Sequence, residues 1–268
     1  MVADNATSLR RGVEVLRVLG GDEALGSGGL GVLQIAHLVG SDKSQVSRTL
    51  KTLAEYGLVD RDPETRAYRL GWSLFALAAR AGNTQLLAAG ESVVKELVRR
   101  VDERAHLSVL EGGEVLTVLS RSPGRALEAA GWVGRFVPAY CSSSGRALLL
   151  DHTAAELTEL FGTTRFVRLG TNTAGSIAEL GERIREARAR GYAIVDEEFE
   201  PGLVAAAAPV RDFRGRIVAA LNVSGPKFRL GDRLEEAGVE AARAADLLSA
   251  RLGWEGGSAP AELQVEQG

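Results

Sequence analysis

The chain has 268 residues, 45% of them apolar and 25% charged, so its composition is that of a globular protein rather than a disordered one, and its length suits two domains. The formal net charge of −3 gives no overall indication of a nucleic-acid partner. Cys141 is the only cysteine, which excludes an internal disulfide and a cysteine cluster for zinc.

The N-terminal third begins with short amphipathic segments. An apolar stripe predicts a helix over residues 8–19, which a pair of glycines ends. Residues 21–31 are rich in glycine and lack the Gly-Lys-Ser/Thr ending of a phosphate-binding loop, so we expect a mobile spacer there. A further short helix is predicted over residues 32–39, before a glycine.

The helix in the segment DKSQVSRTLKTLAEYG has two different faces. Val46, Leu50 and Leu53 lie at i, i+4 and i+7, which is the stripe of a helix that buries one side. Ser41 or Asp42 stands where a side-chain oxygen can cap the first turn. The opposite face is polar and basic near its N-terminal end. Taken alone, such a face also fits a helix that is simply solvated.

A short hairpin follows, with strands predicted at 58–61 and 67–70 around an Asp-Pro turn. Two helices joined by a turn and followed by such a wing form a winged helix-turn-helix, whose second helix enters the DNA major groove at its N-terminal part. Residues 1–83 carry 10 Lys+Arg against 9 Asp+Glu (+1), and the rest carry 22 against 26 (−4), so the front part is the less acidic. The candidate DNA contacts are Lys43, Ser44, Gln45, Ser47, Arg48, Lys51 and Arg66.

The second part of the chain alternates helices with hairpins. An apolar helix over residues 72–83 links the two parts, and Trp72 and Phe75 are too apolar for a solvated linker, so we expect a second subunit to pack there. Beyond it, we expect helices over residues 86–101, from about Ser143, over 176–191 and over about 232–252. One hairpin is predicted with Gly112-Gly113 at its tip and another around residues 211–215. Hairpins mixed with helices predict an α+β domain with a largely antiparallel sheet. The expected boundaries are 8–71 for the winged helix-turn-helix domain, 72–83 for the linker helix, 84–252 for the α+β domain and 253–268 for a disordered tail.

Several long motifs carry a family resemblance. They are IAHLVGSDKSQVSRTLKTLAEYGLV and YRLG in the first domain, and VPAYCSSSGRALL and GYAIVDEEFEPGLVAAAAPVRDFRGRIVAALNVSGP in the second. With these motifs the chain resembles the IclR family of bacterial transcription regulators over about residues 8–252. The resemblance implies a winged helix-turn-helix, a linker helix and a GAF-like effector-binding domain. It also implies a homodimer or homotetramer that binds promoter DNA and responds to a small organic molecule, frequently a carboxylate or an aromatic metabolite. The family includes repressors and activators, and of the two we favour a repressor.

The sequence departs from the family pattern in two places. Ser41-Asp42 replaces the Leu-Pro pair that commonly precedes the recognition helix, and Ala205 replaces a Cys that often lines the effector pocket. Ligand identity therefore does not transfer from the family. The resemblance suggests Ser143, Ser144, Ala205, Asn222 and Ser224 as effector-binding residues, and we add His106 and Asp196 to this candidate set. Asp196 belongs to an acidic run over residues 196–198, which also fits paired catalytic carboxylates, a cation site or a solvated strand end.

The direction of two of these side chains is open from spacing alone. Asn222 and Ser224 alternate with Val223 along a predicted strand, so both face the same side. If Leu221 and Val223 pack into the domain core, Asn222 and Ser224 face the opposite side, and otherwise they point into a cavity. The family resemblance favours the cavity.

The segment Cys141-Ser142-Ser143-Ser144-Gly145 leaves an enzymatic alternative. In it, Cys141 would be a nucleophile that converts a small molecule, with His106 or His152 as the base, and the front domain would be regulatory. In the resembled family this segment opens the effector pocket, where free N–H groups at a helix start attract an anion. A wing and a recognition helix contribute nothing to catalysis, so we expect a regulator and not an enzyme.

No metal, cofactor or membrane partner is expected. The histidines at 37, 106 and 152 lack ligand spacing. The N-terminal residues contain no apolar signal region, and the longest apolar run, residues 203–210, is too short to cross a bilayer, which indicates a cytoplasmic protein. The sequence leaves open the effector, the operator, the sign of regulation and the choice between dimer and tetramer.

Overall fold

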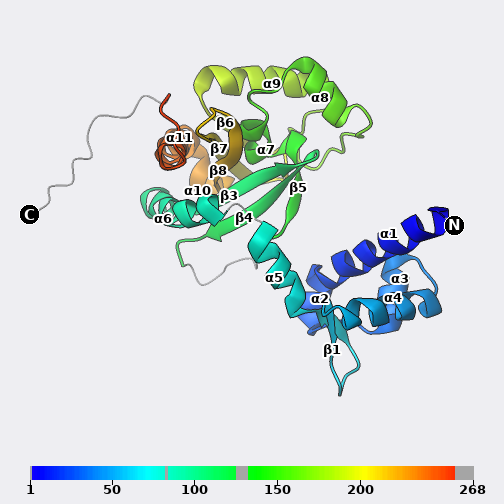
Figure 1. The fold of residues 1–268 in the computed structure, drawn as a ribbon. Coiled ribbons are helices and arrows are strands. Elements are labelled where there is room, and N and C mark those ends of the chain that lie inside the picture. Colours follow the sequence, from blue (N-terminus) through cyan, green and yellow to red (C-terminus); the bar gives the residue numbers. More distant parts are fainter. Residues whose placement is uncertain (1, 82–83, 125–131, 257–268) are drawn as a thin grey trace, which may run out of the picture. The chain divides into compact units, whose positions relative to one another are not determined.

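The computed structural model of the protein describes residues 2–81, 84–124 and 132–256 (Figure 1). Contacts between residues divide the chain into two compact units, residues 1–84 and 85–268. Residues 82–83 of the expected linker and 257–268 of the expected tail lie outside the described residues.

The first unit is a helical domain with a small two-stranded sheet. Its elements are α1 (Val2–Leu19), α2 (Asp22–Ser27), α3 (Val32–Val39), α4 (Lys43–Glu55), β1 (Val59–Arg61), β2 (Tyr68–Leu70) and α5 (Trp72–Ala81). Ile35, Val46 and Leu50 are fully buried in its core, which confirms the predicted inner face of α4. Gly40 joins α3 to α4 with a φ of 66°, a conformation that favours glycine, so the chain turns sharply between the two helices. The predicted winged helix-turn-helix is confirmed.

The glycine-rich segment before α3 differs from the expected spacer. It contains the short helix α2, whose Ala24 is buried in the core of the unit. Gly28 ends this helix with a φ of 72°. The expectation of a mobile spacer was wrong because two buried apolar side chains, Ala24 and Leu30, anchor the segment in spite of its glycines.

The second unit contains a six-stranded antiparallel sheet in the order β5-β4-β3-β8-β7-β6. Its strands are β3 (Arg104–Glu111), β4 (Glu114–Arg121), β5 (Phe136–Pro138), β6 (Ala193–Asp196), β7 (Leu203–Arg211) and β8 (Ile217–Pro226). Its helices are α6 (Thr84–Val101), α7 (Ser143–Leu148), α8 (Ala154–Phe161), α9 (Ile177–Arg190), α10 (Lys227–Leu230) and α11 (Leu234–Arg251). The predicted α+β class and the antiparallel sheet are confirmed, whereas α8, β5 and α10 were not anticipated.

Helices cover both faces of this sheet, so the unit has two cores (Figure 1). On one face α6 and α11 pack against the strands, with Leu97, Leu107 and Leu221 buried between them. On the other face α7 packs on the sheet, with α8 and α9 behind it. Side chains that alternate along the strands therefore enter two different environments.

The β3–β4 hairpin contains an irregularity in its pairing. Leu107 pairs with Leu119, but Ser108 pairs with Thr117, so Val118 is an extra residue on β4. This is a β-bulge, which changes the face that the following side chains occupy. Because of it, Thr117 faces the same side of the sheet as Ser108.

Candidate functional site

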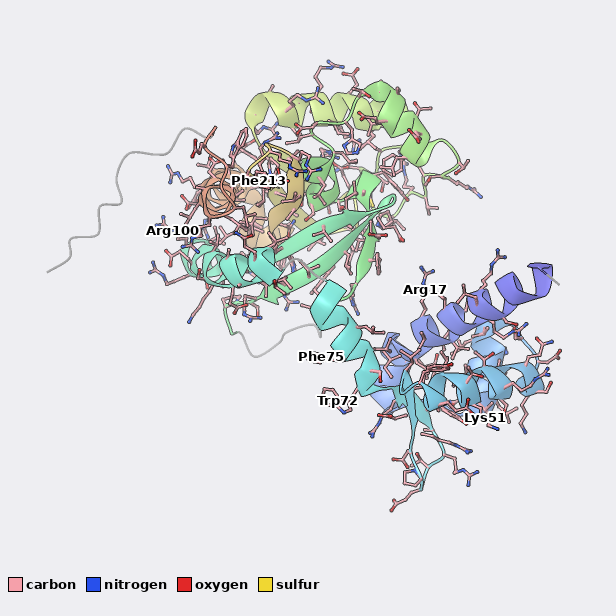
Figure 2. All side chains as sticks on the ribbon, in the orientation of Figure 1. Arg17, Lys51, Trp72, Phe75, Arg100 and Phe213 are labelled. Atoms are coloured by element: carbon pink, nitrogen blue, oxygen red, sulfur yellow. The ribbon has the colours of Figure 1, made fainter. Side chains whose placement is uncertain are left out.

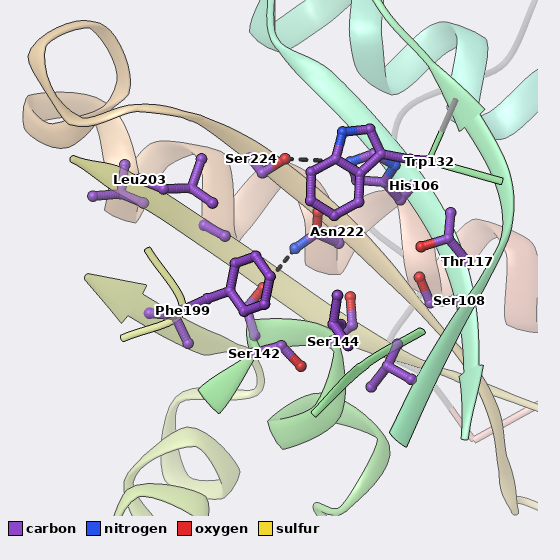
Figure 3. Close-up of a pocket in the computed structure, with 16 residues that line it drawn as sticks. His106, Ser108, Thr117, Trp132, Ser142, Ser144, Phe199, Leu203, Asn222 and Ser224 are labelled. Carbon is purple, nitrogen blue, oxygen red and sulfur yellow. Dashed lines mark hydrogen bonds between the residues drawn. The ribbon is translucent and has the colours of Figure 1, made fainter. Parts of the chain in front are cut away.

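The second unit has a cavity between the sheet and the start of α7 (Figure 3). Six of the seven residues suggested from the sequence line it, and Asp196 does not. The described lining residues are His106, Ser108, Val115, Thr117, Trp132, Val137, Ser142, Ser143, Ser144, Val195, Phe199, Leu203, Val204, Ala205, Asn222 and Ser224.

A polar strip crosses one wall of the cavity. His106 on β3 lies opposite Asn222 on β8, and Ser224 follows two residues later. Leu221 and Val223, which alternate with them, pack into the core on the other face. Asn222 and Ser224 therefore face the side opposite that core, as the first of the two alternatives predicts, and this side is the cavity. The opposition between the two alternatives was wrong, because the sheet has a core on one face and the cavity on the other.

The start of α7 joins this strip through a direct contact. The Asn222 side-chain amide donates a hydrogen bond to Ser143 Oγ over 2.5 Å. Ser142 caps the helix, because its Oγ accepts a hydrogen bond from the backbone N–H of Gly145 at 3.1 Å. The sheet and the helix therefore hold the serines of this end of the cavity in place.

Apolar side chains form the rest of the wall. Trp132 packs beside His106, with 5.3 Å between the ring centroids. Phe199 comes from the segment between β6 and β7, and Leu203 is the first residue of β7 (Figure 3). Val115 and Val137 add branched apolar surface from the hairpin side. A few polar groups in an apolar cavity are typical of a site for a small organic molecule.

His106 is an uncharged member of this wall. Its burial, with a smaller contribution from the nearby positive charge of Arg104, lowers its pKa to about 3. It is therefore neutral at physiological pH. None of the other described lining residues is an acid or a base, so the polar contacts available there are hydrogen bonds from hydroxyl, amide and imidazole groups.

Asp196 lies outside this cavity. Lys227 Nζ forms ion pairs with Asp196 Oδ1 and Glu197 Oε2, each at 2.8 Å. This contact connects the end of β6 to the start of α10, and Asp196 is not part of the cavity wall. The expectation failed because one residue along a strand reverses the direction of the side chain.

Sequence reasoning missed several residues of the cavity. Ser108 continues the alternation that begins at His106 and could have been found from it. Thr117 could not, because the bulge at Val118 changes its face. Trp132 and Phe199 lie in connecting segments, which have no periodic pattern that could assign them to a wall.

Cys141 is not placed to act as a nucleophile. It is fully buried, it does not line the cavity, and its Sγ lies 3.6 Å from the carbonyl oxygen of Pro138. Burial, followed by the negative charge of Glu198, raises the pKa of the thiol to about 12. A reactive cysteine needs a thiolate, which this environment disfavours.

The described part of the chain contains no group of three or more His, Cys, Asp or Glu side chains that could hold a metal ion. Among the described helices, none has both the length and the apolar character needed to cross a membrane.

The candidate DNA-binding surface lies on the first unit. The side chains of Ser44, Ser47, Arg48 and Lys51 are exposed on α4, whereas Val46 is fully buried (Lys51 is labelled in Figure 2). Lys43 is also exposed, while Gln45 is half-buried. Arg66 is exposed in the turn between β1 and β2. Six of the seven residues suggested from the sequence therefore lie on α4, and Arg66 lies on the wing.

We expect the Arg48→Ala variant to bind promoter DNA roughly tenfold or more weakly, because one good base contact contributes about 1–3 kcal/mol. The arginine is exposed and α4 buries its other face, so the fold is expected to stay intact. The measurement is a fluorescence anisotropy titration with DNA from upstream of the gene. Lys95→Ala, which removes one exposed positive charge from α6, is the matched control. Equal affinities of wild type and Arg48→Ala would exclude a contact by Arg48.

Comparisons with known proteins match both units. Residues 8–63 match the IclR helix-turn-helix domain, and residues 78–249 match the bacterial transcriptional regulator IclR C-terminal domain. The HTH-type transcriptional regulator BhcR of Paracoccus denitrificans is 32% identical over 225 residues, which are 81% of this chain and 80% of BhcR. The HTH-type transcriptional repressor AllR of Klebsiella pneumoniae is 29% identical over 250 residues, 92% of this chain and 90% of AllR. The crystal structure of an IclR homolog complexed with 4-hydroxybenzoate from Microbacterium hydrocarbonoxydans superposes with a TM-score of 0.79 at 25% identity, covering 91% of this chain and 98% of that one.

Proposed function

The chain belongs to the IclR family of ligand-responsive bacterial transcriptional regulators, and from this premise we propose that it is a repressor whose promoter binding changes when a small aromatic or carboxylate molecule occupies the cavity of the second unit. The observation that carries the proposal is the joint occurrence of a winged helix-turn-helix and a mostly apolar cavity with a polar strip. Its relatives are regulators rather than enzymes, and the buried Cys141 gives the enzymatic alternative no support.

Two features of related proteins support the finer part of this proposal. AllR is named as a repressor, which supports the same sign of regulation here. The structural relative with 4-hydroxybenzoate supports an aromatic acid as the class of effector. Trp132 and Phe199 offer aromatic faces to such a ring, and the hydroxyls at the start of α7 offer donors to its carboxylate.

On the DNA side, we propose that Lys43, Ser44, Gln45, Ser47 and Arg48 lie in the major groove or on its edges. Lys51 and Arg66 suit phosphates, because their positive charges are exposed. The effector must bind one conformational state of the protein better than the other, since otherwise it cannot change the affinity for DNA.

Ala205→Leu is expected to abolish the response to the effector while DNA binding in its absence stays unchanged. Ala205 lies in the cavity wall on β7, opposite Ser224, so three added carbon atoms occupy the ligand's space. A thermal-shift screen of aromatic and aliphatic acids on the full chain first identifies a ligand. DNA titrations with and without that ligand then test the variant.

The control for this experiment is Ala205→Ser, which adds one atom and is expected to keep the response. If the leucine variant responds with the wild-type ligand dose, the effector binds elsewhere. If its DNA affinity falls without any ligand, the variant has disturbed the first unit or the assembly instead.

We also propose that the protein is a homodimer through its first unit, with a tetramer as the alternative. Trp72, Phe75 and Leu77 on α5 are 79%, 67% and 60% exposed, and the first two rings contact each other edge to face (Figure 2). Such an apolar patch is typical of an interface.

Light scattering of the full chain at micromolar concentration is expected to give a mass of at least twice the 28.3 kDa of one chain. The double variant Trp72→Glu with Phe75→Glu is expected to have a lower mass in the same measurement. A wild-type mass of one chain would contradict the proposal.

A further inference from the structure

The imidazole of His106 has incomplete hydrogen bonding in the cavity wall. The residue is only 5% exposed. Nε2 lies 3.3 Å from Ser224 Oγ, whereas Nδ1 is buried with no hydrogen-bond partner. A buried polar atom without a partner has lost its hydrogen bonds to water and has none in their place, which costs free energy. A ligand group that forms a hydrogen bond with such an atom removes this cost, and the ligand therefore gains binding free energy.

Because His106 is uncharged, its tautomer determines which ligand groups can form a hydrogen bond with Nδ1. A neutral imidazole has one N–H and one bare nitrogen, and the tautomer depends on its partners. If Nε2–H donates to Ser224, Nδ1 is an acceptor. If Ser224 donates to Nε2, Nδ1 carries the hydrogen and is a donor. A hydroxyl group fits both cases, since it can donate or accept.

The other end of the polar strip calls for a different ligand group. Ser143 Oγ accepts its hydrogen bond from the Asn222 amide, so the hydroxyl hydrogen of Ser143 is left to donate. A carboxylate or carbonyl oxygen suits this donor. Asn222 lies between the two ends in the cavity wall (Figure 3). The aromatic side chains of Trp132 and Phe199 in the wall suit a ring that joins the two groups.

From this arrangement we propose that His106 is a specificity-determining residue that recognises a hydroxyl group of the effector, so that the effector is a hydroxylated aromatic acid rather than a simple one. The inference rests on the proposed function only in placing the effector in this cavity. Nδ1 is enclosed in the free structure, with the Trp132 ring in contact with the imidazole, so the hydroxyl reaches it by displacing neighbouring side chains. The hydrogen bond to Ser224 holds the ring in position during that exchange.

The test uses matched ligand pairs and isothermal titration calorimetry on the full chain. The pairs are benzoate with 4-hydroxybenzoate, and phenylacetate with 4-hydroxyphenylacetate. For at least one pair, wild type is expected to bind the hydroxylated acid about tenfold or more tightly, a factor that corresponds to about 1.4 kcal/mol. In His106→Phe, which keeps a ring beside Trp132 but has no nitrogen, that preference is expected to disappear. The affinity for the unsubstituted acid is expected to change less than about threefold, because it makes no hydrogen bond to the imidazole.

A purely structural role of His106 predicts a different result, in which both members of a pair lose affinity equally, and that result overturns the proposal. So does a wild type that shows no preference for the hydroxyl, or that binds none of the four acids. His106→Ala, which cannot overfill the cavity, must give the same loss of preference, and it replaces the phenylalanine variant if the latter does not fold.

The same samples separate this inference from the proposed function. If the hydroxylated acid binds with a preference that depends on His106 but leaves the DNA affinity unchanged, the inference stands and the regulatory proposal fails. If another molecule changes the DNA affinity and none of these acids binds, the regulatory proposal stands and the role of His106 falls.

Discussion

Replacing Glu198 with Gln is expected to destabilise the second unit by about 3–5 kcal/mol, because the change leaves a buried positive charge without its counter-charge. Glu198 Oε2 lies 2.6 Å from Arg146 Nη2, and the two side chains are 6% and 4% exposed. Arg146 also donates to the carbonyl oxygen of Ile194. Arg183 reaches the same carboxylate at 2.6 Å, but it is 22% exposed and remains partly hydrated when the pair is broken.

Thermal unfolding followed by circular dichroism measures this effect, and a shift of roughly 10 °C is expected for a unit of this size. Glu186→Gln on the exposed surface of α9 is the matched control and is expected to stay within about 0.5 kcal/mol of wild type. The double replacement Arg146→Met with Glu198→Met removes both charges and is expected to cost much less than Glu198→Gln alone. If single and double variants are equally unstable, the charge imbalance is not the cause.

Gly145→Ala is expected to destabilise the second unit by more than about 3 kcal/mol, since the added methyl group has no space. A Cβ built on Gly145 lies 2.6 Å from the carbonyl carbon of Ala139, and closer still to the oxygen and Cα of that residue. These are backbone atoms, which a rotamer change cannot move. Helix α7 would have to shift, and with it Ser143, so the variant is also expected to bind the effector poorly.

Gly181→Ala provides the contrast for this prediction. Gly181 is a helical glycine of α9, and a Cβ added there would meet no atom within 4 Å apart from its chain neighbours and the backbone of its own helix. Alanine favours helix over glycine, so this variant is expected to gain about 0.5–1 kcal/mol. Both are compared with wild type by urea unfolding. A Gly145→Ala protein as stable as wild type would mean that α7 and the turn before it adapt without cost.

The parts of the fold that were predicted correctly are those with a strong local pattern. The stripe of Val46, Leu50 and Leu53 gave the inner face of α4, and paired glycines between apolar runs gave the β3–β4 hairpin. Helix α2 was missed, because its sequence has one buried apolar residue, Ala24, and propensity alone argues for a loop. Tertiary packing overrides such weak preferences.

The cavity residues that were found from the sequence likewise had a local pattern or belonged to a family motif. Asn222 and Ser224 were placed on one face by the alternation of their strand, and Ser143 and Ser144 by the resemblance to a family. Trp132 had no such signal. Whether a connecting segment enters a wall depends on contacts between residues far apart in the sequence, and local spacing does not carry this information.

The extra residue in β4 also bears on how relatives with this fold could come to respond to different molecules. With Val118 outside the regular pairing, Thr117 stands opposite Ser108 and adds a hydroxyl to the wall. If the pairing were regular through this point, Val118 would stand there instead, and residues 114–117 would exchange faces. The polarity of this wall would then change although no side chain had been replaced. Ligand preference could therefore diverge through the position of a single inserted or deleted codon, and an alignment of substitutions alone would not reveal it.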